Sequence, residues 1–285
     1  MIYVVLTDRL GNNLFQVGAA LSITPQVTLV VESSEAEQQI DKYGDSFFSN
    51  LSIVDSPPKG VPVYQESRFN FDKIPYVPGK PLVLRGYFQS YKYLKRDVAI
   101  KQFGPSESTK LSLISDFPFL NDPDCVSVHV RRGDYLKATY EHPVCGASFF
   151  AAARTLIGED KNFVVMSDDI DWCKRNFRGG NVEFMEGTTD VTDLYVASLC
   201  SAHIISNSSF GWWGAYLASL RRGCVIAPTP WFGFRSKADT RDLLPEEWLT
   251  IGSGQTIGKN LFARIQFLSA HIRYKLAAVK SGYDR

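Results

Sequence analysis

The sequence lacks several features that would point directly to a class of function. Its 285 residues carry a formal net charge of +1, which predicts neither a nucleic-acid-binding surface nor a polybasic membrane patch. No stretch reaches about 18 consecutive apolar residues, so we expect no membrane-spanning helix. The N-terminal apolar run is short and has no basic region before it, unlike a signal peptide. We therefore expect a cytoplasmic protein.

Cysteine and histidine are too few and too scattered to predict a structural metal site. The five cysteines are odd in number and none has CxxC spacing, which favours buried thiols in a reducing compartment over disulfides. The four histidines form no HExxH pattern. Asp168 and Asp169 are adjacent and lack DxD spacing, so their expected role is to cap a helix.

What the sequence does contain is an alternation of short apolar runs with helical patterns. This alternation is typical of an α/β fold with a parallel, doubly wound sheet. Residues 50–80 are rich in proline and are expected to be irregular. The expected strands are 2–7, 27–32, 82–86, 126–130, 163–167, 182–185, 202–206 and 224–227, and the expected helices are 14–23, 91–103, 111–120, 146–157, 168–177, 191–200 and 211–222.

The turn at residues 121–124 (Asn-Asp-Pro-Asp) is the natural boundary between the two halves. We expect an N-terminal α/β domain over 1–121 and a Rossmann-like, nucleotide-binding domain over 122–258. Residues 259–285 are expected to form a basic, amphipathic C-terminal helix. Such a helix either contacts a membrane surface peripherally or packs back on the body of the protein, which is the commoner arrangement.

The most informative stretch is residues 126–135, Val-Ser-Val-His-Val-Arg-Arg-Gly-Asp-Tyr. An alternating β-branched run predicts a strand, and it ends in Arg131 and Arg132. Ligands of open α/β sheets bind at the carboxyl ends of strands, and the guanidinium fork suits phosphate oxygens. We therefore expect an anion site here. His129 shares a strand face with Arg131, and a like charge beside it favours its neutral form.

A second polar segment, Ser206–Ser209, follows the expected strand at 202–206 and opens a helix. Free N–H groups at such a helix start bind phosphate, although the segment would also serve as a simple serine or asparagine N-cap. Asp193 lies at the start of the preceding helix. It is either a helix-dipole residue or a carboxylate that reads the N–H edge of guanine.

Four blocks together resemble the α-1,2-fucosyltransferase family, which shares motifs with the α-1,6- and protein O-fucosyltransferases. The blocks HxRRGDY and SNSSFGWW are the more specific. The chain departs from the family in having Asn13-Leu14 where Gln-Met is frequent, and Gly211 where serine is common. The four blocks are Arg9–Gln16, Gly86–Ser90, His129–Tyr135 and Asp193–Leu217.

The resemblance implies a two-domain GT-B-like fold whose C-terminal domain binds the donor GDP-β-L-fucose. It implies metal-independent, inverting transfer of L-fucose to the 2-OH of a terminal β-galactoside, in surface-polysaccharide or glycan synthesis. No cofactor and no nucleic-acid partner is implied. Animal members carry an N-terminal membrane anchor, so a chain without one is expected to be a bacterial enzyme in the cytoplasm or at the periphery of the inner membrane.

The resemblance also assigns residues by motif. Arg131 would hold the β-phosphate, Asp193 would read guanine, and Asn12 would face the donor sugar. Asp134 is the first candidate for the catalytic base, with Asp8 second. The implied catalytic residues are Arg131, Asn12 and Asp134; the implied donor-binding residues are His129, Arg131, Arg132, Asp193, Ser208 and Ser209; the implied acceptor-binding residues are Tyr87 and Gln89.

Two other classes stay open at this point. One is a transferase with the same sheet arrangement that uses a different nucleotide sugar. The other is a non-catalytic module that binds GDP or a glycan, which turnover of the nucleotide sugar would distinguish from an enzyme.

Overall fold

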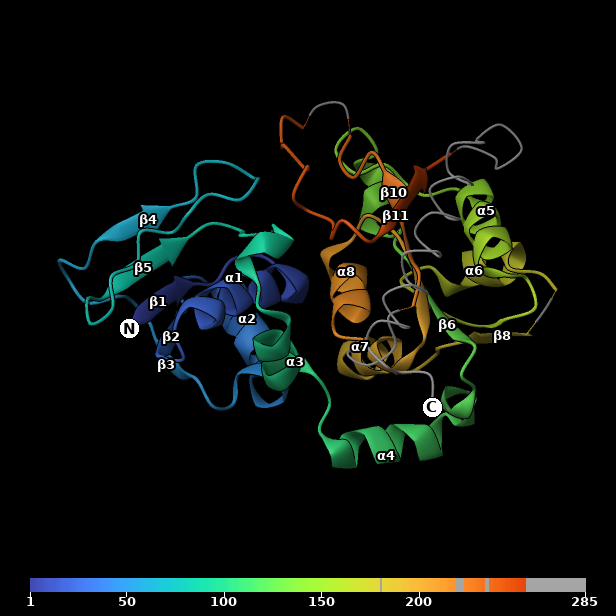
Figure 1. Cartoon of the computed structure of the whole chain (residues 1–285), viewed down its shortest axis with the longest axis horizontal. Coiled ribbons are helices and arrows are strands. Elements are labelled where there is room, and N and C mark those ends of the chain that lie inside the picture. Colours follow the sequence, from blue (N-terminus) through green and yellow to red (C-terminus); the bar gives the residue numbers. More distant parts are fainter. Residues whose placement is uncertain (180, 219–222, 234–235, 255–285) are drawn as a thin grey trace, which may run out of the picture. The chain divides into compact units, whose positions relative to one another are not determined.

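The computed structural model describes residues 1–179, 181–218, 223–233 and 236–254, which form two compact units (Figure 1). Unit 1 comprises Met1–Gly104 and Lys237–Pro245. Unit 2 comprises Pro105–Ser236 and the chain from Glu246 onward. The predicted α/β class with two domains is confirmed, because each unit contains its own parallel sheet. No helix in the described ranges is long and apolar enough to cross a membrane.

Unit 1 is built on a five-stranded parallel sheet in the order β3-β2-β1-β5-β4. The central strands are almost wholly buried, as expected for a parallel sheet covered on its faces. The strands are β1 (Ile2–Val5), β2 (Val27–Val30), β3 (Ser52–Val54), β4 (Val63–Gln65) and β5 (Leu82–Arg85), and the helices are α1 (Leu10–Ile23), α2 (Ser34–Tyr43) and α3 (Arg96–Phe103).

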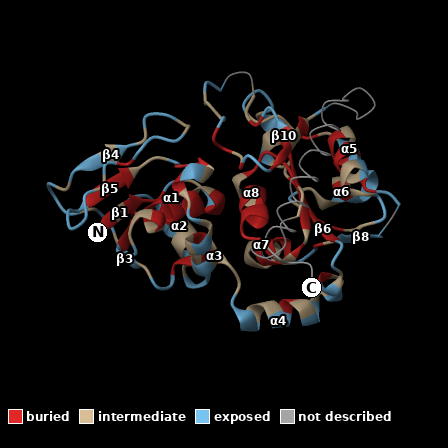
Figure 2. Ribbon diagram, in the orientation of Figure 1, coloured by how far each residue is buried: buried red, intermediate tan, exposed pale blue. Residues whose placement is uncertain are grey.

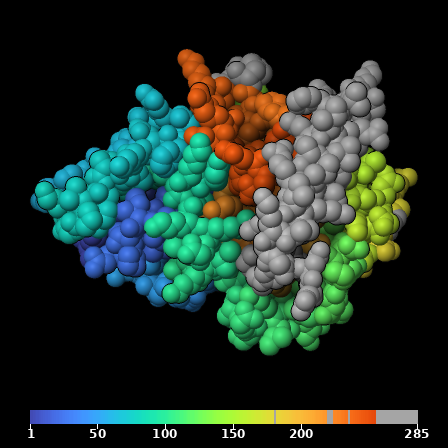
Figure 3. Space-filling view, in the orientation of Figure 1, coloured from blue at the N-terminus to red at the C-terminus, as the bar shows by residue number. Residues whose placement is uncertain are grey.

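The sequence predicted that the proline-rich segment 50–80 would be irregular, but the structure places two short strands in it. It contributes β3 and β4, the two edge strands of the sheet. Each has three residues, most of them exposed, so neither shows the apolar alternation from which a strand is recognised. β3 and β4 are strands because they pair with β2 and β5, and a local sequence pattern does not show such pairing. The rest of this segment forms part of the surface of unit 1 (Figure 3, cyan).

Unit 2 is built on a six-stranded parallel sheet in the order β11-β10-β9-β6-β7-β8. Strand β6 lies in the interior of the sheet, with β9 on one side and β7 on the other. The strands are β6 (Cys125–Val130), β7 (Asn162–Ser167), β8 (Asn181–Phe184), β9 (Ala202–Ile205), β10 (Val225–Thr229) and β11 (Leu249–Gly252), and the helices are α4 (Glu107–Asp116), α5 (Ala147–Ile157), α6 (Ile170–Asn176), α7 (Asp190–Leu199) and α8 (Ser209–Tyr216).

The boundary between the units differs from the predicted one at 121/122. Helix α4 contacts α7, and the turn Pro118–Asn121 contacts β6, so both belong to unit 2. The chain also returns to unit 1 at Lys237–Pro245, where Asp242 accepts hydrogen bonds from Phe71 N (3.2 Å) and Lys92 Nζ (2.7 Å). Sequence periodicity cannot show such a return. The predicted C-terminal helix over 259–285 lies outside the described residues.

Helices α7 and α8 pack closely in the core of unit 2, where α8 is buried along most of its length (Figure 2). Trp212 and Trp213 are fully buried in α8. Gly214 lies on the α7 side, where an added Cβ would stand 2.9 Å from the Ala197 Cβ. The absence of a side chain at residue 214 therefore lets the two helices approach.

We expect Gly214→Val to lower the free energy of unfolding by about 1–3 kcal/mol, because the larger side chain overpacks the contact with Ala197. Urea unfolding of the single variants and of the double variant Ala197→Gly/Gly214→Val measures the coupling. The double variant should lose less stability than the sum of the two single losses. If the stability loss of the double variant equals the sum of the two single losses, the contact with Ala197 does not limit the size of residue 214.

Candidate functional site

The strand order creates a topological switch point in each sheet. In unit 2 the chain runs outward from β6 through β7 and β8, and then resumes at β9 on the other side of β6. The loops after β6 and β9 therefore leave the carboxyl edge in opposite directions, and ligands of open α/β sheets bind in the crevice between such loops. In unit 1 the equivalent position lies between β1 and β5.

Arg131 follows β6 at this switch point, and its backbone N–H donates to Ser206 Oγ at the end of β9 (3.0 Å). Its guanidinium forms two ion pairs, from Nη2 to Asp134 Oδ1 (2.7 Å) and from Nη1 to Asp168 Oδ2 (3.0 Å). The guanidinium also lies over the ring of Tyr135, 5.5 Å from its centroid. Arg131 is thus positioned at the point where the sequence predicted an anion site.

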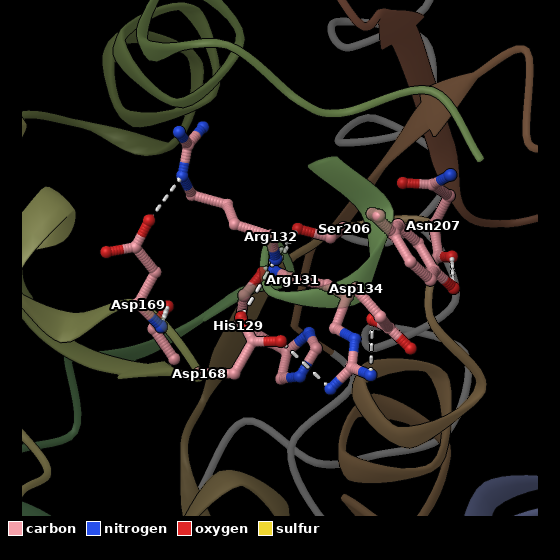
Figure 4. Close-up of polar contacts among 10 residues, drawn as sticks. His129, Arg131, Arg132, Asp134, Asp168, Asp169, Ser206 and Asn207 are labelled. Carbon is pink, nitrogen blue, oxygen red and sulfur yellow. Dashed lines mark hydrogen bonds and ion pairs between the residues drawn. The ribbon is translucent and has the colours of Figure 1, made fainter. Parts of the chain in front are cut away.

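Arg132 turns away from Arg131, and Figure 4 shows the two guanidinium groups leaving the strand end in different directions. Arg132 Nε pairs with Asp169 Oδ2 (3.0 Å), and the guanidinium lies 4.0 Å from the centre of the Trp172 ring. Asp169 also accepts from Trp172 N as the N-cap of α6, which confirms the capping role predicted for it. The contacts of Arg132 therefore stabilise the turn.

Two buried residues join the turn after β9 to the end of β6. The Ser206 hydroxyl donates to His129 O (3.0 Å) while it accepts from Arg131 N. Asn207 Nδ2 donates to Trp231 O (2.9 Å), and Asn207 O accepts from the Tyr135 hydroxyl (3.1 Å). These contacts fix the start of α8 beside Arg131. Ser208 and Ser209, the residues predicted to bind phosphate, follow directly after this buried pair.

Ser208 is the N-cap residue of α8, but its side chain makes no capping hydrogen bond within the described chain. The simple capping role considered for Ser208 is thus not realised. The first N–H groups of a helix have no intrahelical partner, and they carry the positive end of the helix dipole. Ser208 is buried and Ser209 is half-buried. The start of α8 is consequently suited to an anion.

His129 lies on the same side of β6 as Arg131 and packs against the start of α8. An added Cβ on Gly211 would stand 2.6 Å from His129 Nδ1, so the ring occupies the space that a serine at residue 211 would need. Nδ1 is buried and has no hydrogen-bond partner among the described residues. Burial lowers the pKa of His129 to about 4, with Arg131 adding to the decrease against the opposing effect of Asp168. The ring is therefore neutral at pH 7, as expected.

Asp193 lies in the first turn of α7, which follows β8 and so begins at the same carboxyl edge as the Arg131 turn. Its Oδ1 accepts from the Thr188 hydroxyl (2.6 Å). Burial, with a smaller contribution from Asp190, raises the pKa of Asp193 to about 6. Asp193 is thus a half-buried acceptor at the sheet edge, where a guanine reader was predicted.

The other three predicted residues lie at the switch point of unit 1. Gln89 Nε2 donates to Asn12 Oδ1 (2.7 Å), so the structure brings together two residues predicted separately. The Tyr87 hydroxyl donates to Asp8, and this hydrogen bond, with burial, raises the pKa of Tyr87 to about 12. Asp8 and Phe88 both have left-handed backbone conformations (φ of 62° and 52°), which are uncommon outside glycine.

A buried amide network holds these two loops of unit 1 in place. Gln16 Nε2 donates to Thr7 Oγ1 (2.7 Å) and to Gly86 O (2.9 Å), which ties the loop after β1 to the loop after β5. Asn13 Nδ2 adds a bond to Thr7 O (2.8 Å). The residues in the Arg9–Gln16 block therefore divide into exposed Arg9 and half-buried Asn12 on one hand and a buried supporting part on the other.

Sequence reasoning did not place Asp168 beside Arg131. Besides its ion pair with Arg131, Asp168 Oδ1 accepts from Arg132 N (2.8 Å). The signal was present, because two adjacent parallel strands end in Arg-Arg and Asp-Asp, and the register pairs Val130 with Ser167. Reading it requires knowing that β6 and β7 are neighbours. Among the described residues, no three histidine, cysteine or acidic side chains are grouped as they would be to hold a metal ion.

Comparison with known families shows to which family the chain belongs. Residues 63–252 match the model of glycosyl transferase family 11, a range that includes the Arg131 turn, Asp193 and the start of α8. The chain belongs to this family. The predicted family is therefore confirmed. The Arg9–Gln16 block lies before the matched range.

Three curated relatives of this family 11 chain are similar over part of its length. An alpha-1,2-colitosyltransferase of Escherichia coli is 42% identical over 137 residues, which is 44% of this chain and 47% of the relative. The O-antigen biosynthesis glycosyltransferase WbnK of Escherichia coli is 26% identical over 185 residues, 59% of this chain and 60% of the relative. The human galactoside alpha-(1,2)-fucosyltransferase 1 is 34% identical over 104 residues, 33% of this chain and 28% of the relative. The chain thus spans less than two thirds of each relative.

Among solved structures, the fucosyltransferase NodZ from Bradyrhizobium is similar with a TM-score of 0.48 and 13% identity, covering 75% of this chain and 91% of that chain. The structure of POFUT1 in complex with GDP is similar with a TM-score of 0.41 and 12% identity, covering 76% and 93% of the two chains.

His129 and Asp193 should make opposite contributions to the pH dependence of stability in this family 11 protein. His129 has a pKa near 4 when folded and about 6.5 when unfolded, so only the unfolded chain binds its proton between these values and stability falls as pH falls. Asp193 has a pKa near 6 in the folded chain and about 3.8 in the unfolded chain. Between these values only the folded chain binds its proton, so stability falls as pH rises.

Urea unfolding at pH 7.5 and pH 5 measures both contributions, each on the order of 2 kcal/mol. On acidification, His129→Asn should lose less stability than the wild type, and Asp193→Asn should lose more. A shift of both variants in the same direction would contradict the pKa assignments.

Proposed function

We propose that the protein transfers L-fucose from GDP-β-L-fucose to the 2-OH of a terminal β-galactoside, with inversion. Membership of glycosyl transferase family 11 and the similarity to a human galactoside alpha-(1,2)-fucosyltransferase support this proposal. The observation that carries it is the position of Arg131, beside the start of α8 at the switch point of the unit 2 sheet. A cation and helix N–H groups that converge at such a point suit a diphosphate.

The same groups stabilise the charge that develops during transfer. As the bond between the fucose anomeric carbon and the β-phosphate oxygen breaks, GDP leaves with the electron pair and the sugar becomes positive. Arg131, the positive end of the α8 dipole and the side chains of Ser208 and Ser209 oppose the growing negative charge on the phosphate. Such preorganised contacts accelerate the reaction because they strengthen in the transition state.

The remaining assignments follow the position of each residue. In unit 2, Asp193 is the proposed acceptor for the guanine N–H edge, and neutral His129 packs beside the nucleotide. In unit 1, the side-chain amides of Asn12 and Gln89 are hydrogen-bonded to each other, and Tyr87 presents a partly exposed ring. These groups suit the hydroxyls and the apolar face of a sugar. They are the proposed acceptor side, and Asn12 is also a proposed catalytic residue.

Asp134 is the first candidate for the base, and Asp8 is the second. Asp134 Oδ1 pairs with Arg131 at 2.7 Å, so Asp134 would have to leave this ion pair before it accepts the acceptor proton. Asp8, in the loop after β1, accepts a hydrogen bond from the Tyr87 hydroxyl. Its left-handed backbone is of the kind that clusters at functional sites.

A second candidate is transfer of colitose, the 3-deoxy counterpart of L-fucose. The observation that favours it is the 42% identity to an alpha-1,2-colitosyltransferase over 137 residues. The two donors share the nucleotide and differ at the sugar. The residues of the Arg131 turn, which are proposed to contact the diphosphate, therefore do not distinguish one donor from the other.

We expect Arg131→Ala to reduce transfer by about 100- to 1000-fold, because one preorganised contact to the leaving group is lost. Arg131→Lys should recover only part of the rate, since an ammonium lacks the planar fork. Release of GDP from GDP-fucose in the presence of acceptor measures the rate. Arg175→Ala, which removes an exposed arginine on α6, is the matched control. Turnover of a folded Arg131→Ala protein at the wild-type rate would overturn the assignment.

A donor and acceptor panel tests the substrate side. GDP-fucose, GDP-colitose and other GDP- and UDP-sugars are compared with lactose, lacto-N-biose, N-acetyllactosamine and galactose as acceptors. We expect the highest kcat/KM with GDP-fucose and a β-galactoside. A preference for GDP-colitose would select the second candidate. Binding of GDP without release of GDP from any donor would indicate a binding module.

A further inference from the structure

Two carboxylates share the guanidinium of Arg131, and they are not equivalent. Asp168 Oδ2 contacts Nη1 at 3.0 Å and Asp134 Oδ1 contacts Nη2 at 2.7 Å (Figure 4). The Asp168 side chain is 26% exposed, against 48% for Asp134. Each nitrogen of the fork therefore has its own carboxylate, one more buried than the other.

Asp168 is held in place by contacts other than the ion pair. Its Oδ1 accepts from the backbone N–H of Arg132 at 2.8 Å. Its Oδ2 lies against the backbone of Gly133, where an added Cβ would stand 2.6 Å away. Moving this carboxylate would break a hydrogen bond to the turn that carries both arginines. Asp168 is therefore part of the frame of the turn.

Asp134 lies in a single 3-10 turn, Asp134–Lys137, in which no residue is buried. An ion pair between partly exposed side chains contributes little to stability, so releasing it costs little. A diphosphate that reaches Arg131 brings negative charge toward two carboxylates. The repulsion between the phosphate and the carboxylates is relieved at the lowest free-energy cost when the more exposed carboxylate, Asp134, moves away.

We propose that a nucleoside diphosphate displaces Asp134 from Nη2 of Arg131, while Asp168 stays on Nη1 as a positioning residue that aims the fork. Asp134 is thus a counter-ion that occupies the phosphate position when the site is empty. This inference rests on the proposed function, because it takes GDP as the ligand. According to this proposal, Asp134 lowers the affinity of the site for GDP and Asp168 raises it.

Calorimetric titration of GDP into Asp134→Asn and Asp168→Asn tests the proposal. Both substitutions keep the shape and remove one negative charge, so a general change of field would move both affinities in the same direction. Asp168→Asn also preserves the frame of the turn, because the amide oxygen of the new side chain still accepts from Arg132 N. We expect Asp134→Asn to bind GDP about 3- to 5-fold tighter, since the competing ion pair is gone. We expect Asp168→Asn to bind GDP about tenfold weaker, because the fork loses its orienting partner.

Asp171→Asn is the matched control, since Asp171 is exposed in the first turn of α6 and its loss removes the same charge. Its affinity for GDP should equal that of the wild type. Opposite shifts in the two test variants, with Asp171→Asn unchanged, support the displacement. Shifts of both test variants in the same direction overturn it.

Asp134→Asn decides the matter if Asp168→Asn does not fold, because Asp134 is exposed. Unchanged or weaker binding by Asp134→Asn then overturns the displacement, and tighter binding supports it. Failure of the wild type to bind GDP is a different result. It overturns the proposed function itself, and the displacement with it.

Discussion

The site depends on the interior position of β6 in the unit 2 sheet. Parallel pairing with both β7 and β9 brings three strand ends to one edge, and each end supplies a different chemical group. β6 supplies the arginines, β7 supplies the aspartates that hold them, and β9 supplies the turn that opens α8. The backbone bond from Arg131 to Ser206 joins two of these ends directly.

The charges of the protein groups at this edge are nearly balanced. Each of the two arginines faces at least one carboxylate, and His129 is neutral because it is buried against α8. The local field available to an incoming anion therefore comes from the helix start and from whichever carboxylate can be moved. This balance is consistent with the near-zero net charge of the chain, which excluded a general anion-binding surface.

The sequence predicted the elements of unit 2 well because its interior strands are short apolar runs between helical patterns. Arg131, Ser208 and Asp193 were placed at one edge because the carboxyl ends of parallel strands share an edge. The edge strands β3 and β4 could not be predicted, since their residues are mostly exposed and lack alternation. Strand β11 was missed as well. The contact of Asp168 with Arg131 was not predicted, because it depends on the pairing of β6 with β7, which no local pattern shows. The resemblance to a family supplied the ligand chemistry, which strand and helix patterns do not.

The return of Lys237–Pro245 to unit 1 makes that unit discontinuous along the chain. Asp242 is buried there and bonds to Lys92, while its backbone oxygen accepts from Tyr91 N (3.0 Å). A gene fragment ending near residue 104 would encode a protein that lacks this closing segment. Exchange of this unit between relatives by a single crossover would therefore leave unit 1 incomplete. Recombination at both ends of the inserted unit is the arrangement that keeps each module whole.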